Sequence, residues 1–481
     1  MARFSSISLT EYAEFLHQLW PGVGLPSRLG IALSGGVDSM ALAYLTSRLF
    51  SSHNSPPSAI HAFIVDHKVR PESTTEACSV AQLAKETYGF TAHVLPLTWA
   101  LSHTELLNGL ETRARIARYQ TLGRACVENR VEKLLLAHHA DDQAETVLMR
   151  LLAGSKIQGL AGMRAAAGIP ECGDIFGAER VVLGRPLLAV EKGRLRATCL
   201  ENEVHWFEDR TNQDATLTRR NAVRKLLSAS PPRLPRALQR PSLVALARRA
   251  EARNKSVKDQ ARMVLEEDCD ISFDPTTGSL QLQLPPKIRG IQPHVLQNLL
   301  VRVVETITPL PRAETQSLQT PLKSILSNQG KPFTAAGLKW TYLSDKTWFL
   351  QRQNYTSKSR GLCRIVFISI NPGWTSWRLW DGRWWVRLFI PIPSHPAICV
   401  RAMEEKDIGP LREKAAQVNM DRQLEKLLKE GLRGEMRFII PAVYCGGEVL
   451  GLPSAGLWLG SGPSEEGVKC EVMFRGRGGL V

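Results

Sequence analysis

The sequence predicts an α/β protein: a doubly wound, parallel five-stranded sheet, followed by a helical basic region and a smaller β-rich C-terminal domain. Apolar strand-like runs alternate with helix-like segments between residues 28 and 188. This alternation is typical of a parallel sheet that helices cover on both faces. Polar or glycine-rich clusters follow three of the runs, which is where such sheets bind their ligands.

The predicted strands are short apolar runs that turn residues or helical segments separate. They cover residues 28–33, 59–66, 91–97, 133–137 and 181–188. The spacing of apolar residues predicts helices over 39–50, 74–89, 105–129 and 141–153. Gly89 is a typical C-cap for the second helix, and the acids that begin the fourth suit the positive end of a helix dipole.

The rest of the chain changes character twice. Residues 192–258 are basic and helical, and a proline-rich break at 228–241 indicates a boundary or hinge. Beyond Gly361 the chain becomes β-rich, and Asp381-Gly382 between two apolar runs predicts a hairpin. Because 481 residues exceed what one core supports, we predict three domains, 1–225, 226–355 and 356–481.

Composition narrows the class of partner and the compartment. The formal net charge of +15 favours an anionic partner, with nucleic acid and a membrane surface as the candidates. No apolar run approaches the roughly 20 residues that span a bilayer, so we expect no membrane insertion. The nine cysteines are scattered singly, which argues against zinc-ribbon and iron–sulfur sites. Their dispersion favours a reducing compartment, either the cytoplasm or a mitochondrial or other organellar matrix.

The stretch Ser34-Gly35-Gly36-Val37-Asp38-Ser39 connects the first predicted strand to the first predicted helix. Backbone N–H groups and the positive helix end suit an anion at such a junction. The two glycines allow close approach of a phosphate, the serines donate hydrogen bonds, and Asp38 can hold a Mg²⁺ that neutralises pyrophosphate. The hexapeptide matches SGGxDS, the pyrophosphate loop of enzymes that split ATP between its α- and β-phosphates. The alternative is a plain glycine turn.

Two further strands end in titratable residues. Asp66-His67 follows the second strand, and His138-His139 follows the fourth, with Asp142 and Glu145 on one face of the next helix. Acids beside a phosphate site require cations, either Mg²⁺ or a substrate ammonium. His138, His139 and Asp142 could instead ligate zinc, but adjacent histidines on an extended segment point to opposite sides.

Arginines recur in two segments. Arg113, Arg115 and Arg118 precede or flank Tyr119 on a predicted helix, where one guanidinium could hold a phosphate bidentately. Residues 208–224 are polar and rich in arginine, and are either a linking loop or a contact for nucleic-acid phosphates.

Together these motifs resemble the tRNA(Ile)-lysidine synthase family. The matching segments, in order, are SGGVDSM (34–40), DHKVRPES (66–73), the AR..RY..L pattern (114–122), AHH.DDQAET..MRL (137–151) and EDRTN.D.T..RN.VR (208–224). The segments WDGR (380–383) and RFIIPAVYCGGEVLGLP (437–453) are similar to that family's C-terminal region more weakly.

The resemblance implies a ligase with a PP-loop, Rossmann-like catalytic domain and two tRNA-contacting regions after it. ATP would adenylate the C2 oxygen of the wobble cytidine in tRNA(Ile) with a CAU anticodon, and free L-lysine would then displace AMP. No membrane is involved, and a homodimer is possible. The implied residues fall into four groups: catalytic Asp38, Arg115, His138, Asp142 and Glu145; ATP-binding Ser34, Gly35, Gly36, Val37, Asp38, Ser39, Asp66 and His67; tRNA-binding Arg210, Arg219, Arg220 and Arg224; and Mg²⁺-binding Asp38 and Asp142.

Other interpretations fit the loop less well. tRNA thiolases of this class use paired cysteines, and asparagine synthetases carry a cysteine where this chain has Ala2. NAD and GMP synthetases would leave the arginine-rich 208–224 segment unexplained. The remaining alternatives are another PP-loop tRNA-modifying enzyme and a catalytically inactive RNA-binding relative.

Overall fold

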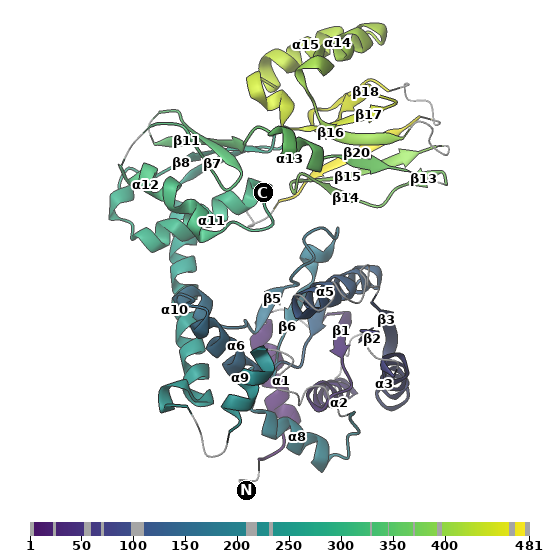
Figure 1. The fold of residues 1–481 in the computed structure, drawn as a ribbon, viewed down its shortest axis with the longest axis vertical. Coiled ribbons are helices and arrows are strands. Elements are labelled where there is room, and N and C mark those ends of the chain that lie inside the picture. Colours follow the sequence, from purple (N-terminus) through teal and green to yellow (C-terminus); the bar gives the residue numbers. More distant parts are fainter. Residues whose placement is uncertain are drawn as a thin grey trace. The chain divides into compact units, whose positions relative to one another are not determined.

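The computed structural model of the chain describes residues 4–22, 26–51, 59–68, 72–97, 110–207, 219–229, 234–327, 330–344, 346–368, 371–391, 397–460 and 467–476. Contacts group the chain into two compact units, Met1–Asn254 and Lys255–Val481 (Figure 1). The division into three domains, 1–225, 226–355 and 356–481, stays a prediction.

The first unit contains a sheet with the strand order β3-β2-β1-β4-β6-β5. The strands are β1 (Arg28–Leu33), β2 (Ala59–Asp66), β3 (Thr91–Pro96), β4 (Lys133–Leu135), β5 (Ala166–Gly168) and β6 (Val182–Gly184). The five predicted parallel strands are present as β1, β2, β3, β4 and β6. The sheet nevertheless has a sixth strand, since β5 pairs antiparallel with β6 at the edge. β5 consists of two alanines and a glycine, so it lacks the apolar run from which a strand is predicted.

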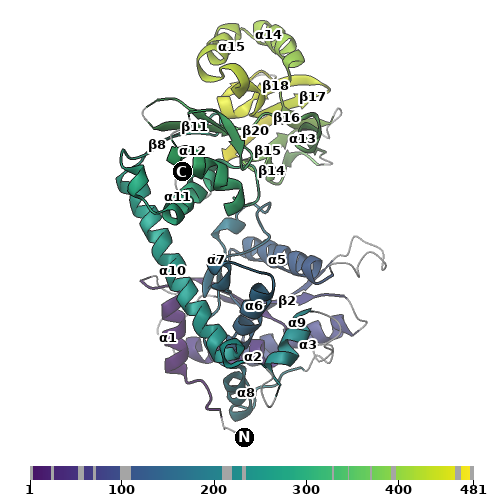
Figure 2. The same cartoon turned by 60° about the vertical axis from the view of Figure 1, so that its left-hand side comes forward.

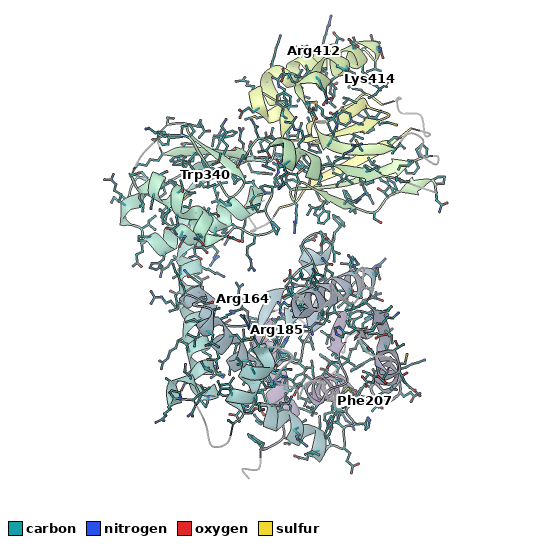
Figure 3. All side chains as sticks on the ribbon, in the orientation of Figure 1. Arg164, Arg185, Phe207, Trp340, Arg412 and Lys414 are labelled. Carbon is teal, nitrogen blue, oxygen red and sulfur yellow. The ribbon has the colours of Figure 1, made fainter. Side chains whose placement is uncertain are left out.

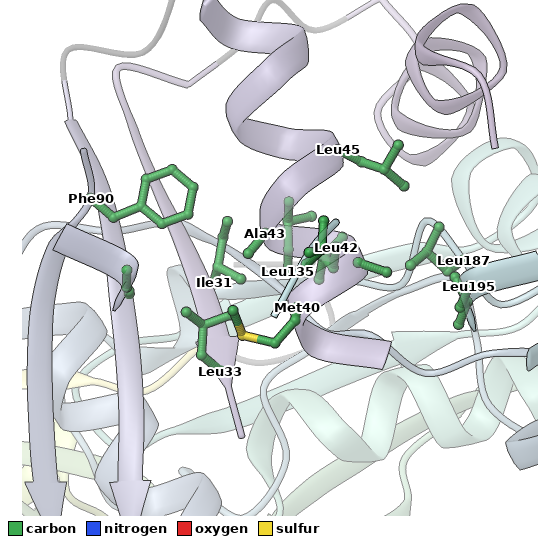
Figure 4. Close-up of a cluster of buried hydrophobic side chains, with 14 of the residues drawn as sticks. Ile31, Leu33, Met40, Leu42, Ala43, Leu45, Phe90, Leu135, Leu187 and Leu195 are labelled. Carbon is green, nitrogen blue, oxygen red and sulfur yellow. The ribbon is translucent and has the colours of Figure 1, made fainter. Parts of the chain in front are cut away.

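Successive residues of the strands point to opposite faces of this sheet, and each face has its own core. The first core joins the sheet to α1 (Leu9–Leu19), α2 (Val37–Ser51), α3 (Ser73–Tyr88) and α8 (Lys192–Glu201) (Figures 1 and 4). The second joins it to α5 (Leu110–Glu128). In β4 the alternation is explicit, because Leu135 belongs to the first core while Leu134 and Leu136 belong to the second. We call these faces the α2 side and the α5 side.

A smaller core joins α6 to two helices from later in the chain. It includes Val147 and Leu148 of α6 (Ala140–Leu152), Val223 of α9 (Arg219–Leu227), and Leu243 of α10 (Arg240–Glu267). Figure 2 shows α6, α9 and α10 beside one another in the first unit. The short α7 (Ile157–Leu160) follows α6. This packing brings the arginine-rich α9 to the acidic start of α6.

The second unit contains three antiparallel sheets. The first consists of β7 (Asp270–Asp274), β8 (Ser279–Gln283), β9 (Phe333–Ala335), β10 (Leu338–Tyr342) and β11 (Thr347–Arg352). The second consists of β12 (Ile365–Phe367), β16 (Ile398–Ala402), β17 (Pro441–Cys445), β18 (Glu448–Leu452) and β19 (Leu457–Trp458). The third consists of β13 (Gly373–Trp374), β14 (Arg378–Trp380), β15 (Trp384–Ile390) and β20 (Lys469–Phe474). The helices are α11 (Pro293–Ile307), α12 (Gln319–Ser327), α13 (Ser357–Leu362), α14 (Ile408–Gln417) and α15 (Asp421–Lys426).

The predicted Asp381-Gly382 hairpin connects β14 to β15, and both residues have a positive φ, of 50° and 66°. Asp381 is buried and pairs with Arg352 at 3.1 Å and with Arg383 at 2.8 Å. Burial acts to raise the pKa of Asp381, but the two arginines outweigh it and hold that pKa below its usual range. Among the described residues, no helix is both long and apolar enough to cross a membrane.

Candidate active site

The candidate site lies at the carboxyl ends of β1, β2, β4 and β6, where ligands bind in open parallel sheets. After β4, the adjacent residues His138 and His139 continue the alternation of the sheet. His139 reaches Asp38 on the α2 side, whereas His138 accepts a hydrogen bond from Arg185, which follows β6. The site therefore has two chemically different sides.

The glycine loop after β1 is held closed by its own hydroxyls. Ser39 Oγ donates to the Gly36 carbonyl at 2.9 Å, and the Ser34 amide donates to Ser39 Oγ at 3.3 Å. Gly35 has φ +80°, and a Cβ there would lie 2.6 Å from Val80 Cγ2, so a side chain is excluded. The Phe207 amide donates to the Gly35 carbonyl at 2.9 Å, which ties the loop to the end of the described segment 110–207.

The loop continues directly into the first turn of α2. Val37 begins the helix, and its carbonyl accepts from Cys199 Sγ of α8 at 3.6 Å. The free N–H groups of this first turn therefore face the same edge of the sheet as the loop, as a phosphate site requires.

Asp38 is the centre of an ionic cluster on the α2 side. Its Oδ2 lies 3.0 Å from Lys192 Nζ and 3.5 Å from His139 Nε2, and Asp142 Oδ2 lies 3.4 Å from the same nitrogen. Burial acts to raise the pKa of Asp38, but His139 and Lys192 outweigh it and lower that pKa. Asp38 Oδ1 is buried without a hydrogen-bond partner in the described part of the chain.

The acids of α6 are paired with arginines of α9. Glu145, only 4% exposed, accepts from Arg220 Nε at 2.9 Å and from Arg224 Nε at 2.7 Å. Arg220 Nη2 also donates to Asp142 Oδ1 at 3.2 Å. Hydrogen bonding to Glu145 raises the pKa of Arg224. Two arginines that the sequence suggested for tRNA thus contact two acids that it suggested for catalysis.

The two other arginines predicted to bind tRNA have different positions. Arg219, the neighbour of Arg220, is exposed and has no ion pair within the described residues. Arg210 lies outside the described residues. Asp141 forms an ion pair with Arg240 Nη1 at 2.8 Å and accepts a hydrogen bond from the Lys192 amide at 3.0 Å. The start of α6 is therefore also connected to the first residues of α8 and α10.

His138 and Arg185 face the α5 side. Arg185 Nε donates to His138 Nδ1 at 3.2 Å, and Arg185 Nη1 donates to the Arg164 carbonyl at 2.8 Å (Figure 3). Burial lowers the pKa of His138 well below its ordinary value, and Arg185 and Arg118 lower it further although Asp142 acts to raise it. A neutral imidazole that accepts at Nδ1 carries its proton on Nε2, so His138 presents a hydrogen-bond donor.

Asp66 is engaged locally. Its carboxylate accepts from Ser73 Oγ at 2.6 Å, Thr74 Oγ1 at 2.7 Å and the Lys68 amide at 3.0 Å. Burial acts to raise the pKa of Asp66, but these hydrogen bonds lower it. Asp66 therefore shapes the turn into α3. His67 follows it, and burial together with Arg118 lowers the pKa of that imidazole.

The predicted residues thus divide into groups. Asp38, Asp142 and Glu145 come together on the α2 side, while Arg115 lies on α5, with its Cζ 5.0 Å from the Tyr119 ring centre. Sequence reasoning did not select Lys192 or Arg185 as site residues, and it named His139 only as a possible zinc ligand. The alternation that begins in β4 could have assigned His139 to the side of Asp38. No local pattern relates Lys192, which is 154 positions from Asp38, to the loop.

A magnesium ion suits this donor set better than zinc. No three His, Cys, Asp or Glu side chains in the described ranges are arranged to hold a metal. Zinc needs such a group, and the two histidines point to opposite sides. Mg²⁺ commonly takes one or two carboxylates together with phosphate oxygens and water. The unpartnered Oδ1 of Asp38 fits that requirement.

Comparison with known proteins identifies the family. Residues 7–230 match the model of the PP-loop domain (ATP_bind_3). A tRNA(Ile)-lysidine synthase from Zymomonas mobilis is 32% identical over 312 residues, which cover 64% of this chain and 83% of that protein. This chain belongs to the tRNA(Ile)-lysidine synthase family. The family resemblance predicted from the ordered motifs is confirmed.

Two further members of the lysidine synthase family show how much of the chain the similarity covers. The "Probable tRNA(Ile)-lysidine synthase" of Schizosaccharomyces pombe is 29% identical over 462 residues, covering 94% of this chain and 96% of that protein. The tRNA(Ile)-lysidine synthase of a Bradyrhizobium species is 38% identical over 230 residues, covering 48% of this chain and 59% of that protein. The PP-loop family uses ATP, and the lysidine synthase match to the yeast protein extends through both compact units.

Proposed function

We propose that this chain joins lysine to C2 of the wobble cytidine of tRNA(Ile) with a CAU anticodon, at the expense of ATP. The observation that carries the proposal is the similarity to the yeast relative over 94% of the chain. The region of similarity includes the second unit, which a general PP-loop enzyme does not need. The SGGVDS loop with Asp38 at the start of α2 supplies the ATP site that the reaction requires.

In the first step, the C2 oxygen of the cytidine attacks the α-phosphorus of ATP, and the bond to the β-phosphate breaks. The loop residues 34–39 and the first turn of α2 bind the β- and γ-phosphates, whose charge the helix end stabilises. Asp38 and Asp142 are the residues that would hold Mg²⁺, and a bound Mg²⁺ neutralises the leaving pyrophosphate. Arg115 is the proposed source of further positive charge for the phosphates.

In the second step, the ε-amine of lysine attacks C2, and AMP leaves with the original oxygen. The amine must lose a proton before or during attack, and Asp142 is the proposed acceptor because it stays ionised beside His139. His138 donates from Nε2 and can hold the adenylated base or its oxygen. Glu145 keeps Arg220 and Arg224 in place around this centre.

The proposed tRNA contacts are based on the positive charge of the chain. The net charge of +15 provides the salt-dependent attraction that phosphates require. Arg219 is exposed and available to a phosphate, whereas Arg220 and Arg224 are occupied by acids of the site. Lysine as the amine donor and a homodimer as the assembly remain predictions of the family resemblance.

The test is direct. Purified chain, ATP, Mg²⁺ and a tRNA(Ile) transcript with a CAU anticodon are incubated with and without isotopically labelled lysine, and the wobble nucleoside is analysed by mass spectrometry. We expect lysidine with lysine and pyrophosphate release that depends on tRNA. Another PP-loop modifying activity would use ATP and tRNA without incorporating lysine. An inactive RNA-binding relative would bind tRNA and release no pyrophosphate, and Asp38→Ala would then change nothing.

A further inference from the structure

On the α5 side, Arg118 and Arg185 have no role in the steps above, and they lie beside two residues that do, Arg115 and His138. Arg115 Cζ and Arg118 Cζ lie 5.0 and 5.2 Å from the centre of the Tyr119 ring. Arg185, 7% exposed, donates to His138 and follows β6 at the same edge of the sheet. We call Arg115, Arg118, Tyr119, His138 and Arg185 the Tyr119 cluster.

The positive charge of this cluster has no ion-pair partner among the described residues. No carboxylate of the described residues forms an ion pair with any of its three arginines. The hydrogen bonds of Arg185 go to His138, the Arg164 carbonyl and Tyr119. Burial lowers the pKa of Arg185, the interaction with Tyr119 acts to raise it, and the charge of Arg115 lowers it further. Buried charges are normally paired, because an unpaired one costs several kcal/mol of folding free energy. A bound anion would supply the missing partner.

The other side of the site has the opposite arrangement. Every acid there already has a cation: Asp38 has Lys192, Asp141 has Arg240, and Glu145 has Arg224. Within the described part of the chain, the α2 side is therefore neutralised, and the α5 side is not. The imbalance is local and does not follow from the overall basic composition.

The triphosphate of ATP does not account for Arg118 and Arg185. The glycine loop leads into α2, whose core lies on the face of the sheet opposite to α5. The alternation in β4 directs His139 toward Asp38 and His138 toward Arg185, so these neighbours serve different sides. A phosphate on residues 34–39 lies on the His139 side.

We propose that Arg118 and Arg185 of the Tyr119 cluster bind a second oxyanion, which belongs to an acceptor substrate and not to ATP. This inference rests on the proposed function, and two groups of that reaction have the required chemistry: a phosphodiester next to the target cytidine, and the α-carboxylate of lysine. Guanidinium groups bind both bidentately.

The test uses Arg118→Gln, which removes a partly exposed cation, and Arg185→Lys, which keeps the charge but loses the planar fork. Arg124→Gln is the matched control, because Arg124 is exposed on the same helix α5. Thermal unfolding establishes that each variant folds. Two reactions are then measured at several salt concentrations: tRNA-dependent pyrophosphate release without lysine, and product formation with lysine or with cadaverine, which lacks the carboxylate.

Each source of the oxyanion gives its own result. If it is the phosphodiester, both variants raise the KM for tRNA about 10- to 100-fold without lysine, and Arg118→Gln reduces the salt slope of binding by about 1. If it is the carboxylate, pyrophosphate release is unchanged, the KM for lysine rises by the same factor, and cadaverine is used as in the wild type. Either result supports the proposal.

Two results would overturn it. Variants that behave like Arg124→Gln in both reactions would show that the cluster binds no substrate anion. A rise in the KM for ATP as the only change would assign the cluster to the triphosphate. A wild-type chain that forms no lysidine refutes the proposed function instead, and this outcome is recognised before any variant is compared.

Discussion

The neighbouring residues Arg219 and Arg220 provide a sharp test of how the site is built. Arg220→Ala removes the hydrogen bonds to Glu145 at 2.9 Å and to Asp142 at 3.2 Å. Removing one partner of a fully buried ion pair costs about 3–5 kcal/mol. Glu145 keeps Arg224, and Arg220 is 31% exposed, so the expected cost falls to about 2–3 kcal/mol. Arg219→Ala removes an exposed cation with no ion pair in the described ranges, so stability should stay within about 0.5 kcal/mol.

The assay combines thermal unfolding with tRNA binding at several salt concentrations. For a unit of this size, about 2–3 kcal/mol corresponds to a fall in Tm of about 5–10 °C for Arg220→Ala. Arg219→Ala should leave Tm unchanged and reduce the salt slope of tRNA binding by about 1. The opposite result, with Arg220→Ala as stable as wild type and a lower salt slope, would show that Arg220 contacts RNA and would refute the internal pairing.

Three further predictions follow from the same contacts. Asp38→Asn should lower tRNA-dependent pyrophosphate release at least about 100-fold and leave the affinity for tRNA nearly unchanged. EDTA should stop the wild-type reaction until Mg²⁺ is restored. A loss of tRNA binding in Asp38→Asn would instead show that this acid has a structural role. Gly35→Ala should raise the KM for ATP and lower stability by about 1–3 kcal/mol, because φ is +80° and the new Cβ would meet Val80; normal ATP use would refute the tight loop. Asp381→Asn should destabilise the second unit by about 3–5 kcal/mol, because buried Arg352 and Arg383 lose their partner. Since the pKa of Asp381 is lowered from 3.8, its contribution is present above about pH 4 and is lost as the pH falls through the lowered pKa, so acid unfolding curves of wild type and variant should converge; a constant difference would contradict this.

The sequence was sufficient for the sheet because each strand carries its own local signal. The runs 28–33 and 59–66 form β1 and β2 with unchanged bounds, and Gly89 caps α3 with φ 69°. Alternation, caps and turn residues act over a few positions, so they can be read without knowing the fold. The edge strand β5 has three residues and no such signal.

The ion pairs of the site could not be predicted in the same way. The motif 208–224 was interpreted as basic and therefore suited to RNA, but Arg220 and Arg224 lie on the face of α9 that packs on α6, and Arg219 does not. That distinction depends on the small core of Val147, Val223 and Leu243, which joins segments distant in sequence. The same holds for Lys192, whose position beside Asp38 follows from the packing of α8 on α2 and from the bond between its amide and Asp141.

The ion pairs that the acids of the site already form also constrain how a cationic substrate enters. Lysine carries an ammonium that needs an acid, yet Asp38, Asp142 and Glu145 are all paired already. An incoming cation must therefore displace a resident one, and the least costly to displace is Lys192, whose side chain is 53% exposed and whose ammonium regains water at once. Arg224 and Arg220 are held by a nearly buried carboxylate and resist exchange. Under the proposed function, Asp38 is thus the acid at which Mg²⁺ and the substrate ammonium would compete with Lys192. Because Mg²⁺ arrives with ATP, the loop should bind the nucleotide before the amine.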